Sequence, residues 1–279
     1  MMCSLTPVTA TLIDRYDDGQ DARHFSFELT ALSAASTPSA GQFFMLTIPG
    51  QGEAAFTYVK LPDARGRFDA LVRRVGTLTS ELFELSAGAV VGIRGPLGRG
   101  LPAIDAGRVL IVAGGCGLAP LSPAVEALRR ESGVRLAVLY GARSRATQVL
   151  SRERASWRRE LPVIEVFDHE PDAPRVTPVD ALDRAWSALG GVPDHVLICG
   201  PDPMMHATAQ ALTARGLVHE RLWLSVERRM HCGVGLCGHC YLGTGYACVQ
   251  GPTYRYDELL RELARHPSRP EALTAIHHC

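Results

Sequence analysis

The sequence predicts a β plus α/β protein that ends in a cysteine-rich segment. Short stretches rich in β-formers, separated by Gly, Pro, Ser and Asp, fill the first hundred residues. Strand-like and helix-like stretches then alternate as far as Val226, and four cysteines follow close together. These observations predict an antiparallel β-barrel over residues 1–102, a parallel-sheet domain over residues 103–226 and a cysteine-loop domain over residues 227–279.

Length and composition exclude some classes of protein. A chain of 279 residues, 46% of them hydrophobic, is long enough for about two packed domains. Lys plus Arg equals Asp plus Glu at 29 each, which gives no support to nucleic acid as a partner. No apolar run approaches the roughly 20 residues of a membrane helix, and residues 1–14 lack a hydrophobic signal segment. We therefore expect a cytoplasmic protein without a membrane partner.

The barrel prediction rests on four short segments that are regularly spaced and rich in β-formers. They are His24–Leu29, Gln42–Ile48, Phe68–Arg74 and Ala89–Arg94. A Gly- and Pro-rich turn at residues 95–102 then marks the boundary to the next domain.

Five further strands are predicted in the second domain: Val109–Ala113, Leu136–Tyr140, Val163–Phe167, Val196–Cys199 and Leu222–Val226. Helices are expected at Pro123–Arg130, with Pro123 in the first turn, and near Pro203–Arg215. A short helical stretch at Ser80–Leu85 belongs to the first domain. Alternation of strands and helices predicts a parallel sheet covered on both faces.

The cysteines have the spacing C-x4-C-x2-C-x7-C and are Cys232, Cys237, Cys240 and Cys248. Plant-type [2Fe–2S] sites share the C-x4-C-x2-C opening. The glycines between them allow a tight loop whose N–H groups reach the sulfurs. Four cysteines also bind zinc, usually as two close pairs, whereas one loop supplies three ligands here. The spacing favours [2Fe–2S] and leaves zinc as the alternative.

The remaining cysteines and the neighbouring histidines carry weaker signals. His231 and His239 flank the ligands, and we interpret them as exposed groups or as groups that support the ligands, because four cysteines are already available. Disulfides are disfavoured by the missing signal segment. Cys3 and Cys279, at the chain ends, are expected to be free thiols.

Three loops have features that suit a dinucleotide. Gly114–Pro120 (GGCGLAP) follows a buried strand and precedes a helix, where glycines let a pyrophosphate approach backbone N–H groups. Cys199–Pro201 (CGP) ends another strand, and Arg73–Thr79 (RRVGTLT) precedes a helix start. Each has a plainer interpretation: a tight packing turn, a buried strand-end cysteine and an ordinary helix cap, respectively.

Together these motifs resemble the ferredoxin–NADP reductase superfamily, in its branch with a C-terminal [2Fe–2S] loop. The segments GGCGLAP, YGAR at 140–143, CGP and ERRMHCGVGLCGHC at 227–240 occur in the order of that family and span nearly the whole chain. The branch includes the electron-transfer subunit of dihydroorotate dehydrogenase, the gamma subunit of sulfhydrogenase (cytoplasmic NiFe hydrogenase) and the corresponding subunit of anaerobic sulfite reductase. The G-H-C ending and the GPTYRYDEL segment look most like the hydrogenase gamma and sulfite reductase types.

The resemblance implies an antiparallel FAD-binding barrel, a parallel-sheet NAD(P)-binding domain and FAD in the cleft between them. It implies that the flavin ring and ribityl chain face Ala55, Phe56, Thr57 and Tyr58. It implies that the pyrophosphate is held by Gly76, Thr77 and Thr79. It implies a nicotinamide nucleotide site lined by Gly114, Gly115, Cys116, Gly117, Pro120, Tyr140, Gly141, Arg143, Cys199, Gly200 and Pro201.

One departure from the family pattern is visible. Most members have Arg-x-Tyr-Ser/Thr at the flavin strand, but this chain reads EAAFTYV from Glu53 and lacks that Arg. Arg73 and Arg74 are the nearest cations to take its place. After the second predicted strand, Arg143 and Arg145 stand where NAD-specific folds often have an acid, which favours NADP. The alternative is a solvated basic face, because further arginines follow.

These expectations define a function. A flavin exchanges hydride with NAD(P)H and single electrons with a cluster, so no protein acid or base is required, and only Cys199 is a candidate for positioning the nicotinamide. We expect a diaphorase subunit that serves the iron–sulfur and catalytic subunits of a hydrogenase-like complex. The alternatives are a dihydroorotate dehydrogenase or sulfite reductase partner, a self-contained reductase of a small acceptor, and a zinc-stapled binding module without redox activity.

Overall fold

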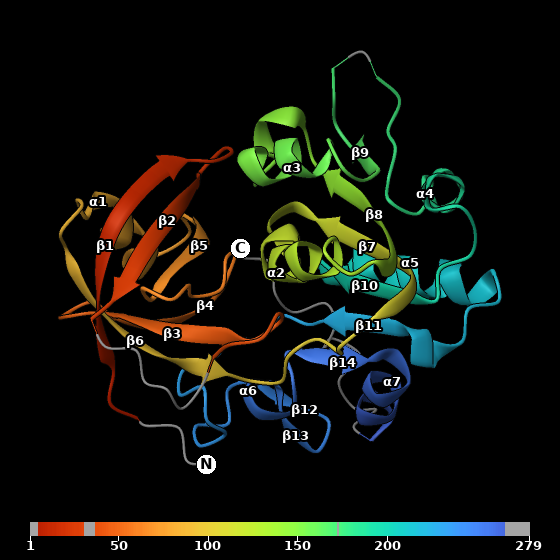
Figure 1. Ribbon diagram of the computed structural model, residues 1–279. Coiled ribbons are helices and arrows are strands. Elements are labelled where there is room, and N and C mark those ends of the chain that lie inside the picture. Colours follow the sequence, from red (N-terminus) through yellow and green to blue (C-terminus); the bar gives the residue numbers. More distant parts are fainter. Residues whose placement is uncertain (1–4, 31–36, 172, 266–279) are drawn as a thin grey trace.

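The computed structural model describes residues 5–30, 37–171 and 173–265. Figure 1 shows an antiparallel barrel on one side, a parallel sheet flanked by helices on the other, and a cysteine loop that lies along the lower edge of both. The predicted β plus α/β class is confirmed. The expectations for Cys3 and Cys279 lie outside the described residues.

The barrel is a six-stranded antiparallel sheet in the order β4-β3-β6-β1-β2-β5. Its strands are β1 (Val8–Asp17), β2 (Ala22–Leu29), β3 (Phe43–Ile48), β4 (Gly52–Thr57), β5 (Arg67–Arg73) and β6 (Val90–Leu97). The segment after β4 closes the barrel, because the N–H groups of Val59 and Lys60 donate to the carbonyl of Asp69 in β5. Phe25, Phe27, Phe44 and Phe68 fill the interior together with Leu12.

Four of these strands match the predicted segments, whereas β1 was not predicted from its own pattern. Only Ala10 and Leu12 of its ten residues are buried, and its apolar Val8 and Ile13 are exposed. The helix predicted after the barrel's fifth strand is α1 (Thr77–Glu84), which begins three residues earlier than expected.

The second sheet has five parallel strands in the order β11-β10-β7-β8-β9. They are β7 (Ala106–Gly114), β8 (Gly133–Ala142), β9 (Val163–Phe167), β10 (His195–Cys199) and β11 (Leu222–Ser225). The chain enters the sheet at β7 and builds outward in both directions, so the order reverses at β7, which is the place where such sheets bind ligands.

Helices cover both faces of this sheet, as predicted. The helices are α2 (Leu118–Leu128), α3 (Ser151–Trp157), α4 (Leu182–Leu189) and α5 (Asp202–Ala214), with short 3-10 turns η1 (Gly115–Gly117), η2 (Arg145–Thr147) and η3 (His219–Arg221). Along β7, Val109 and Ile111 pack with α2 and α3, and Leu110 and Val112 pack with α4 and α5. Burial on both faces explains why β7 is a continuous apolar run.

The position of Pro123 corrects one expectation. Helix α2 starts at Leu118, so Pro123 lies inside the helix rather than in its first turn. The sequence predicts a loop as far as Pro120, whereas the helix begins directly after the glycines. The backbone hydrogen bond that Pro123 cannot make is therefore lost within the helix.

The segment after β11 is more structured than its sequence pattern predicts. It contains β12 (Tyr241–Leu242), β13 (Gly245–Tyr246), α6 (Ala247–Gln250), β14 (Thr253–Arg255) and α7 (Tyr256–Ala264). Strand β14 pairs antiparallel with β11, so the cysteine loop is anchored to the edge of the parallel sheet. On its other side the loop packs against β3 and β6 of the barrel through Phe43, Met45 and Leu97.

Candidate functional site

Three of the predicted nucleotide segments meet at the carboxyl edge of the parallel sheet. Gly114 pairs with Gly141 between β7 and β8, and Ala113 pairs with Cys199 between β7 and β10. The residues after these strand ends are therefore side by side. This arrangement brings together Gly114–Pro120, Gly141–Arg145 and Cys199–Pro201, as an open α/β sheet requires for a ligand site.

The glycines allow the backbones of two of these segments to touch. A Cβ on Gly117 would lie 2.5 Å from the carbonyl oxygen of Cys199, and one on Gly114 would lie 2.5 Å from Sδ of Met204. At Gly115, by contrast, a Cβ would meet nothing within 4 Å, and φ is +53°. The turn thus presents bare backbone to open space just before the N-terminus of α2, which suits a phosphate group.

Cys199 is buried more deeply than its predicted role suggests. Its side chain is 2% exposed, and burial raises the pKa of the thiol well above its ordinary value. The plainer interpretation, a buried strand-end cysteine, accounts for this environment. Pro201, in contrast, is exposed and caps α5, and Pro120 is partly buried in the first turn of α2.

The two arginines after β8 are both exposed but differ in their partners. The backbone N–H of Arg145 donates to Glu170, and its guanidinium lies 3.9 Å from that carboxylate and over the ring of Phe167. Arg143 is exposed at the end of β8. Glu170, which no sequence motif singles out, places a negative charge beside the predicted 2′-phosphate site.

The Arg73–Thr79 loop precedes α1 on the barrel side. The Thr79 hydroxyl accepts hydrogen bonds from the N–H groups of Val75 and Gly76, each at 3.0 Å, and donates to the Gly76 carbonyl at 2.9 Å. This hydroxyl therefore shapes its own loop, and a contact of Thr79 with the pyrophosphate stays a prediction. Gly76 and Thr77 remain exposed at the start of α1.

The two arginines of this loop face different surroundings. Arg74 interacts with Ser80 and Glu84 at 3.4 Å and lies over the ring of Phe83. The Nε of Arg73 is buried and has no hydrogen-bond partner among the described residues. A buried guanidinium donor without a partner beside an open helix N-terminus fits an anionic pyrophosphate. Arg73 also lies near enough to Cys116 to act on the pKa of its thiol, so the two domains approach each other here.

The predicted flavin strand is β4. Ala55, Phe56 and Thr57 are partly exposed along it. Tyr58 follows the strand but is only 4% exposed, with its ring centroid 4.8 Å from that of Phe44 in the barrel core. Tyr58 therefore packs behind the strand, and the contacts of residues 55–58 with the flavin stay a prediction.

A partly buried ion pair that the sequence did not reveal links β4 to the cysteine loop. Arg94 in β6 donates two hydrogen bonds to Glu53, at 2.8 and 2.6 Å, and one to the carbonyl of Cys232 at 3.0 Å. Burial alone would raise the pKa of Glu53, but the hydrogen bonds and charge of Arg94 hold it below its ordinary value. Arg94 is 41 positions from Glu53 and 138 positions from Cys232, and contacts over such separations cannot be predicted from a sequence pattern.

The cysteine loop supplies N–H donors to its own sulfurs. Sγ of Cys232 accepts from the N–H groups of Val234, Leu236 and Cys237 at 3.3–3.5 Å, and Sγ of Cys248 accepts from Gly235 at 3.2 Å. Positive φ values of 72–80° at the three glycines of the loop make this wrap possible. Such bonds stabilise thiolates and are characteristic of iron–sulfur ligand loops.

The four thiols act on one another. Cys232 interacts with Cys237, and Cys248 interacts with both Cys240 and Cys232. A backbone N–H of His239 lowers the pKa of Cys237 to about 7, whereas burial raises that of Cys248 to about 12. The four thiols therefore lie close enough to act on one another, as ligands of one metal centre must.

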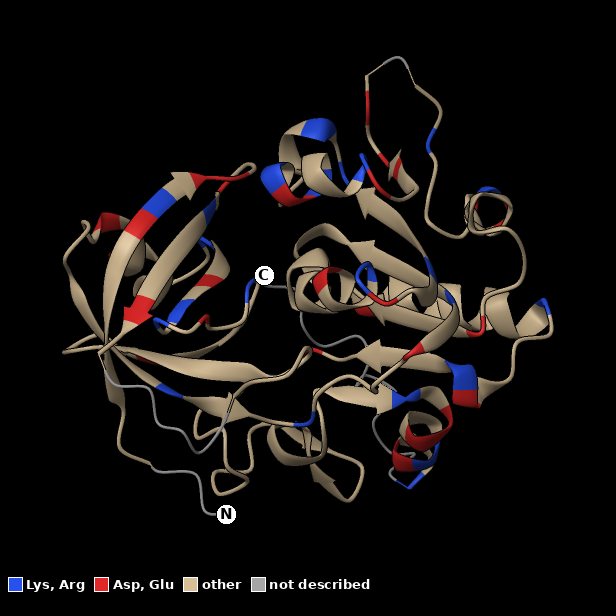
Figure 2. Ribbon diagram, in the orientation of Figure 1, with Lys and Arg blue, Asp and Glu red and all other residues tan. Residues whose placement is uncertain are grey.

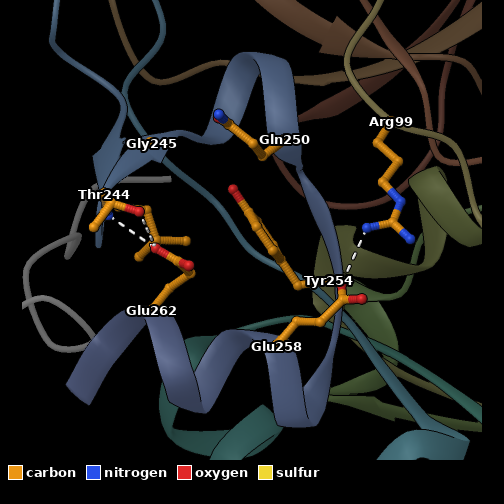
Figure 3. A pocket seen from close by; sticks show the side chains of 8 residues that line it. Arg99, Thr244, Gly245, Gln250, Tyr254, Glu258 and Glu262 are labelled. Carbon is orange, nitrogen blue, oxygen red and sulfur yellow. Dashed lines mark hydrogen bonds and ion pairs between the residues drawn. The ribbon is translucent and has the colours of Figure 1, made fainter. Parts of the chain in front are cut away.

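Beside the cysteine loop lies a shallow pocket of about 210 Å³ between the β12–β13 hairpin and α7 (Figure 3). Its polar groups mostly satisfy one another: Arg99 pairs with Glu258 at 3.0 Å, and Glu262 accepts two hydrogen bonds from Thr244 at 2.9 Å. None of the predicted flavin, nucleotide or cysteine ligands lines it. We interpret it as the joint that holds the hairpin to the end of the chain.

Comparison with known proteins agrees with this geometry. Family models match at residues 9–100 (oxidoreductase FAD-binding domain), 111–210 (oxidoreductase NAD-binding domain) and 227–260 (iron–sulfur cluster binding domain of dihydroorotate dehydrogenase B). The gamma subunit of sulfhydrogenase 1 from Pyrococcus furiosus is 30% identical over 263 residues, which cover 85% of each chain. The chain belongs to the family of ferredoxin–NADP reductase-like electron-transfer subunits with an iron–sulfur domain.

Other members of this family are similarly related. A probable dihydroorotate dehydrogenase B (NAD(+)) electron transfer subunit from Pyrococcus abyssi is 34% identical over 230 residues, covering 78% of this chain and 80% of that one. A solved structure of an NADH-dependent reduced ferredoxin–NADP oxidoreductase, at 24% identity, superposes with a TM-score of 0.75 and covers 95% and 96% of the two chains. That likeness confirms the fold.

The cofactor expectations are thereby confirmed at the level of domains. The chain is an oxidoreductase subunit with FAD-binding, NAD-binding and iron–sulfur-binding domains. Among the helices of the described ranges, none is both long enough and apolar enough to cross a bilayer.

Proposed function

We propose that this subunit passes electrons between a nicotinamide nucleotide and a cytoplasmic, hydrogenase-like complex through FAD and a [2Fe–2S] cluster. The contact of Arg94 with both Glu53 and Cys232 carries the proposal, because it joins the predicted flavin strand directly to the first cluster ligand. We place the FAD domain at residues 1–102, the nucleotide domain at 103–226 and the cluster domain at 227–279.

Each segment has a defined task in this proposal. Arg73 and the N-terminus of α1 bind the pyrophosphate of FAD, and β4 orients the ring. The bare backbone around Gly115 receives the phosphates of the nicotinamide nucleotide. The four cysteines hold the cluster. When bound, FAD supplies the exchange between a hydride pair and single electrons, and the cluster carries single electrons.

The surface around the cysteine loop suits a protein partner. Residues 230–254 contain no Asp, Glu, Lys or Arg, and Figure 2 shows the hairpin and α6 without charged residues. Three large hydrophobic side chains are exposed there: Leu236 at 74%, Tyr241 at 47% and Val249 at 49%. Depletion of charge around exposed apolar and aromatic groups is typical of protein interfaces. The partner therefore docks where electrons leave the cluster.

The relatives support two kinds of partner. The sulfhydrogenase gamma subunits match over most of their length, which supports a hydrogenase. The match of the iron–sulfur model from dihydroorotate dehydrogenase B supports that enzyme as the second candidate. Identifying the subunits that co-purify with the chain distinguishes them.

The coenzyme is proposed to be NADP, bound through Arg143. Arg145 is held by Glu170 and contributes less. A comparison of KM for NADPH and NADH tests this. Arg143→Ala is expected to raise KM for NADPH about tenfold and to leave KM for NADH nearly unchanged; equal changes for both coenzymes would contradict the assignment.

The substitution Cys237→Ser tests the proposed electron path. Cys237 is exposed, so its replacement leaves the buried core intact. We expect electron delivery to the co-purified partner to fall at least about 100-fold, while reduction of bound FAD by NAD(P)H keeps its rate. Partner reduction at the wild-type rate would contradict the proposal. Loss of flavin reduction as well would show that the loop is needed for the fold of the FAD site.

A further inference from the structure

The hairpin between β1 and β2 makes a polar contact with α3 of the nucleotide domain. The carboxylate of Asp18 accepts the N–H groups of Leu150 at 2.9 Å and Ser151 at 3.0 Å, and the Ser151 hydroxyl at 2.8 Å. Figures 1 and 2 show the acidic tip of this hairpin facing the basic helix α3. Asp18 is only 2% exposed, so a carboxylate is fixed at the domain boundary.

His24 lies behind this carboxylate and is oriented by a second one. Its Nε2 is 3.3 Å from Oδ2 of Asp69. Its Nδ1 has no hydrogen-bond partner among the described residues and lies 3.8 Å from Oδ2 of Asp18. The ring is 1% exposed and stacks on Tyr16. A histidine that donates one ring N–H to a carboxylate and directs the other nitrogen into a buried space has the arrangement of a metal ligand.

Glu153 of α3 completes the group. Its Oε2 is buried and also lacks a hydrogen-bond partner among the described residues. Ligand atoms of Asp18, His24 and Glu153 all lie within 4.8 Å of one another. These carboxylates and Asp69 raise the pKa of His24 to about 9 against the effect of its burial, so the cluster favours a positive charge among its carboxylates, either a second proton on His24 or a bound cation.

We propose that Asp18, His24 and Glu153 bind one divalent cation, such as Mn²⁺ or Zn²⁺, at the boundary between the barrel and the nucleotide domain. With metal–ligand bonds of about 2.0–2.2 Å, two ligand atoms on opposite sides of an ion lie up to about 4.4 Å from each other. Small side-chain shifts are therefore enough to bring the three ligand atoms to bonding distance. One nitrogen and two carboxylate ligands suit these ions. The site is separate from the four cysteines.

The ion would hold the two domains together beside both predicted cofactor sites. The N–H of Gln20 in the hairpin donates to the carbonyl of Ala146 in the nucleotide domain at 2.8 Å. The carbonyl of Asp21 accepts from the N–H of Arg74 at 2.8 Å, and Arg74 follows Arg73 in the pyrophosphate loop. A Cβ on Gly19 would lie 2.4 Å from the carbonyl of Gln148. The hairpin therefore contacts both the predicted pyrophosphate loop and the nucleotide domain, and a bound ion fixes the distance between them.

The experiment counts Mn²⁺ ions bound to the holoprotein, with FAD and the oxidised cluster in place, from the loss of the free-ion electron paramagnetic resonance signal. Mn²⁺ prefers oxygen and nitrogen over sulfur, so the cysteine loop does not compete. We expect one Mn²⁺ per chain, released by added Zn²⁺. Glu153→Gln should weaken binding at least about tenfold, and His24→Gln should weaken it further.

Asp17→Asn is the matched control, because Asp17 is adjacent to Asp18 but its side chain is 77% exposed. Its Mn²⁺ affinity should equal that of the wild type. The FAD content of each variant shows that the domains remain folded. A wild-type protein that binds no Mn²⁺, or a folded Glu153→Gln variant that binds Mn²⁺ as tightly as the wild type, would overturn the proposal. In that case His24 is the cation between Asp18 and Asp69.

Discussion

The parallel sheet and the cysteine loop form their sites in different ways. The sheet carries its nucleotide segments on strands whose side chains are buried on both faces, such as Leu110 and Ile111, which are fully buried. The cysteine loop consists of turns with positive φ, a two-stranded hairpin and a small core against the barrel. The predicted nucleotide site is therefore shaped by apolar packing, whereas the loop depends on polar contacts and on the group it binds.

The largest stability effect is expected in the sheet. Ile111→Ala in β7 removes a buried side chain between α2 and the neighbouring strands. The free energy of unfolding should fall by about 3–5 kcal/mol. Urea unfolding followed by circular dichroism measures it, and iron content per folded chain should stay constant. A loss below about 1 kcal/mol would show that packing does not dominate this region.

An intermediate effect is expected where the loop meets the barrel. Arg94→Met leaves Glu53 without its ion pair and the Cys232 carbonyl without one donor. We expect about 2 kcal/mol of destabilisation, less than for a fully buried pair because Glu53 is 22% exposed, and faster iron loss to a chelator.

Arg99→Met is the control for this substitution. Arg99 pairs with Glu258 on the surface near the same loop, and its side chain is 46% exposed. Its replacement should cost less than about 1 kcal/mol and leave the rate of iron loss unchanged. Equal rates for the Arg94 and Arg99 variants would mean that the Arg94 contact does not hold the cluster loop.

The smallest effect is expected at α7. Hydrogen bonds from Arg255 and Arg261 lower the pKa of Asp257 to about 2. Because the folded pKa lies below the unfolded one, this carboxylate stabilises the fold above about pH 4, and the contribution disappears as the pH falls through about 2. Asp257→Asn should therefore cost about 0.5 kcal/mol at about pH 7 and nothing near pH 2. A pH series of thermal unfolding measures the difference, and a cost that persists at about pH 2 would contradict the ion-pair explanation.

Sequence patterns predicted the strands and the ligand loop whose structure depends on residues close together in the chain. The apolar run at Val109–Ala113 and the spacing of the cysteines are properties of neighbouring residues, and both were interpreted correctly as a strand and as a candidate ligand loop. Strand β1, in which two of ten residues are buried and five are exposed, was not predicted. The pairing of β14 with β11 depends on a partner distant in sequence.

The same limit applies to the candidate sites. Arg94 meets Cys232 across 138 positions, and Asp18 meets Ser151 across 133. No sequence motif marks such pairs. The predicted roles of Thr79 and Tyr58 came from resemblance, which identifies a position but not the direction of its side chain. The Thr79 hydroxyl is engaged within its own loop and the Tyr58 ring lies in the barrel core, so both roles stay predictions.

The central claim is that one chain holds a flavin next to a two-iron cluster. Protein purified without oxygen can be assayed together for iron, acid-labile sulfide, zinc and FAD. We predict two irons, two sulfides and one FAD per chain, with a reduced form that gives the electron paramagnetic resonance signal of a [2Fe–2S] centre. Stoichiometric zinc in the cysteine loop without sulfide, in a chain that does not bind FAD, would contradict it.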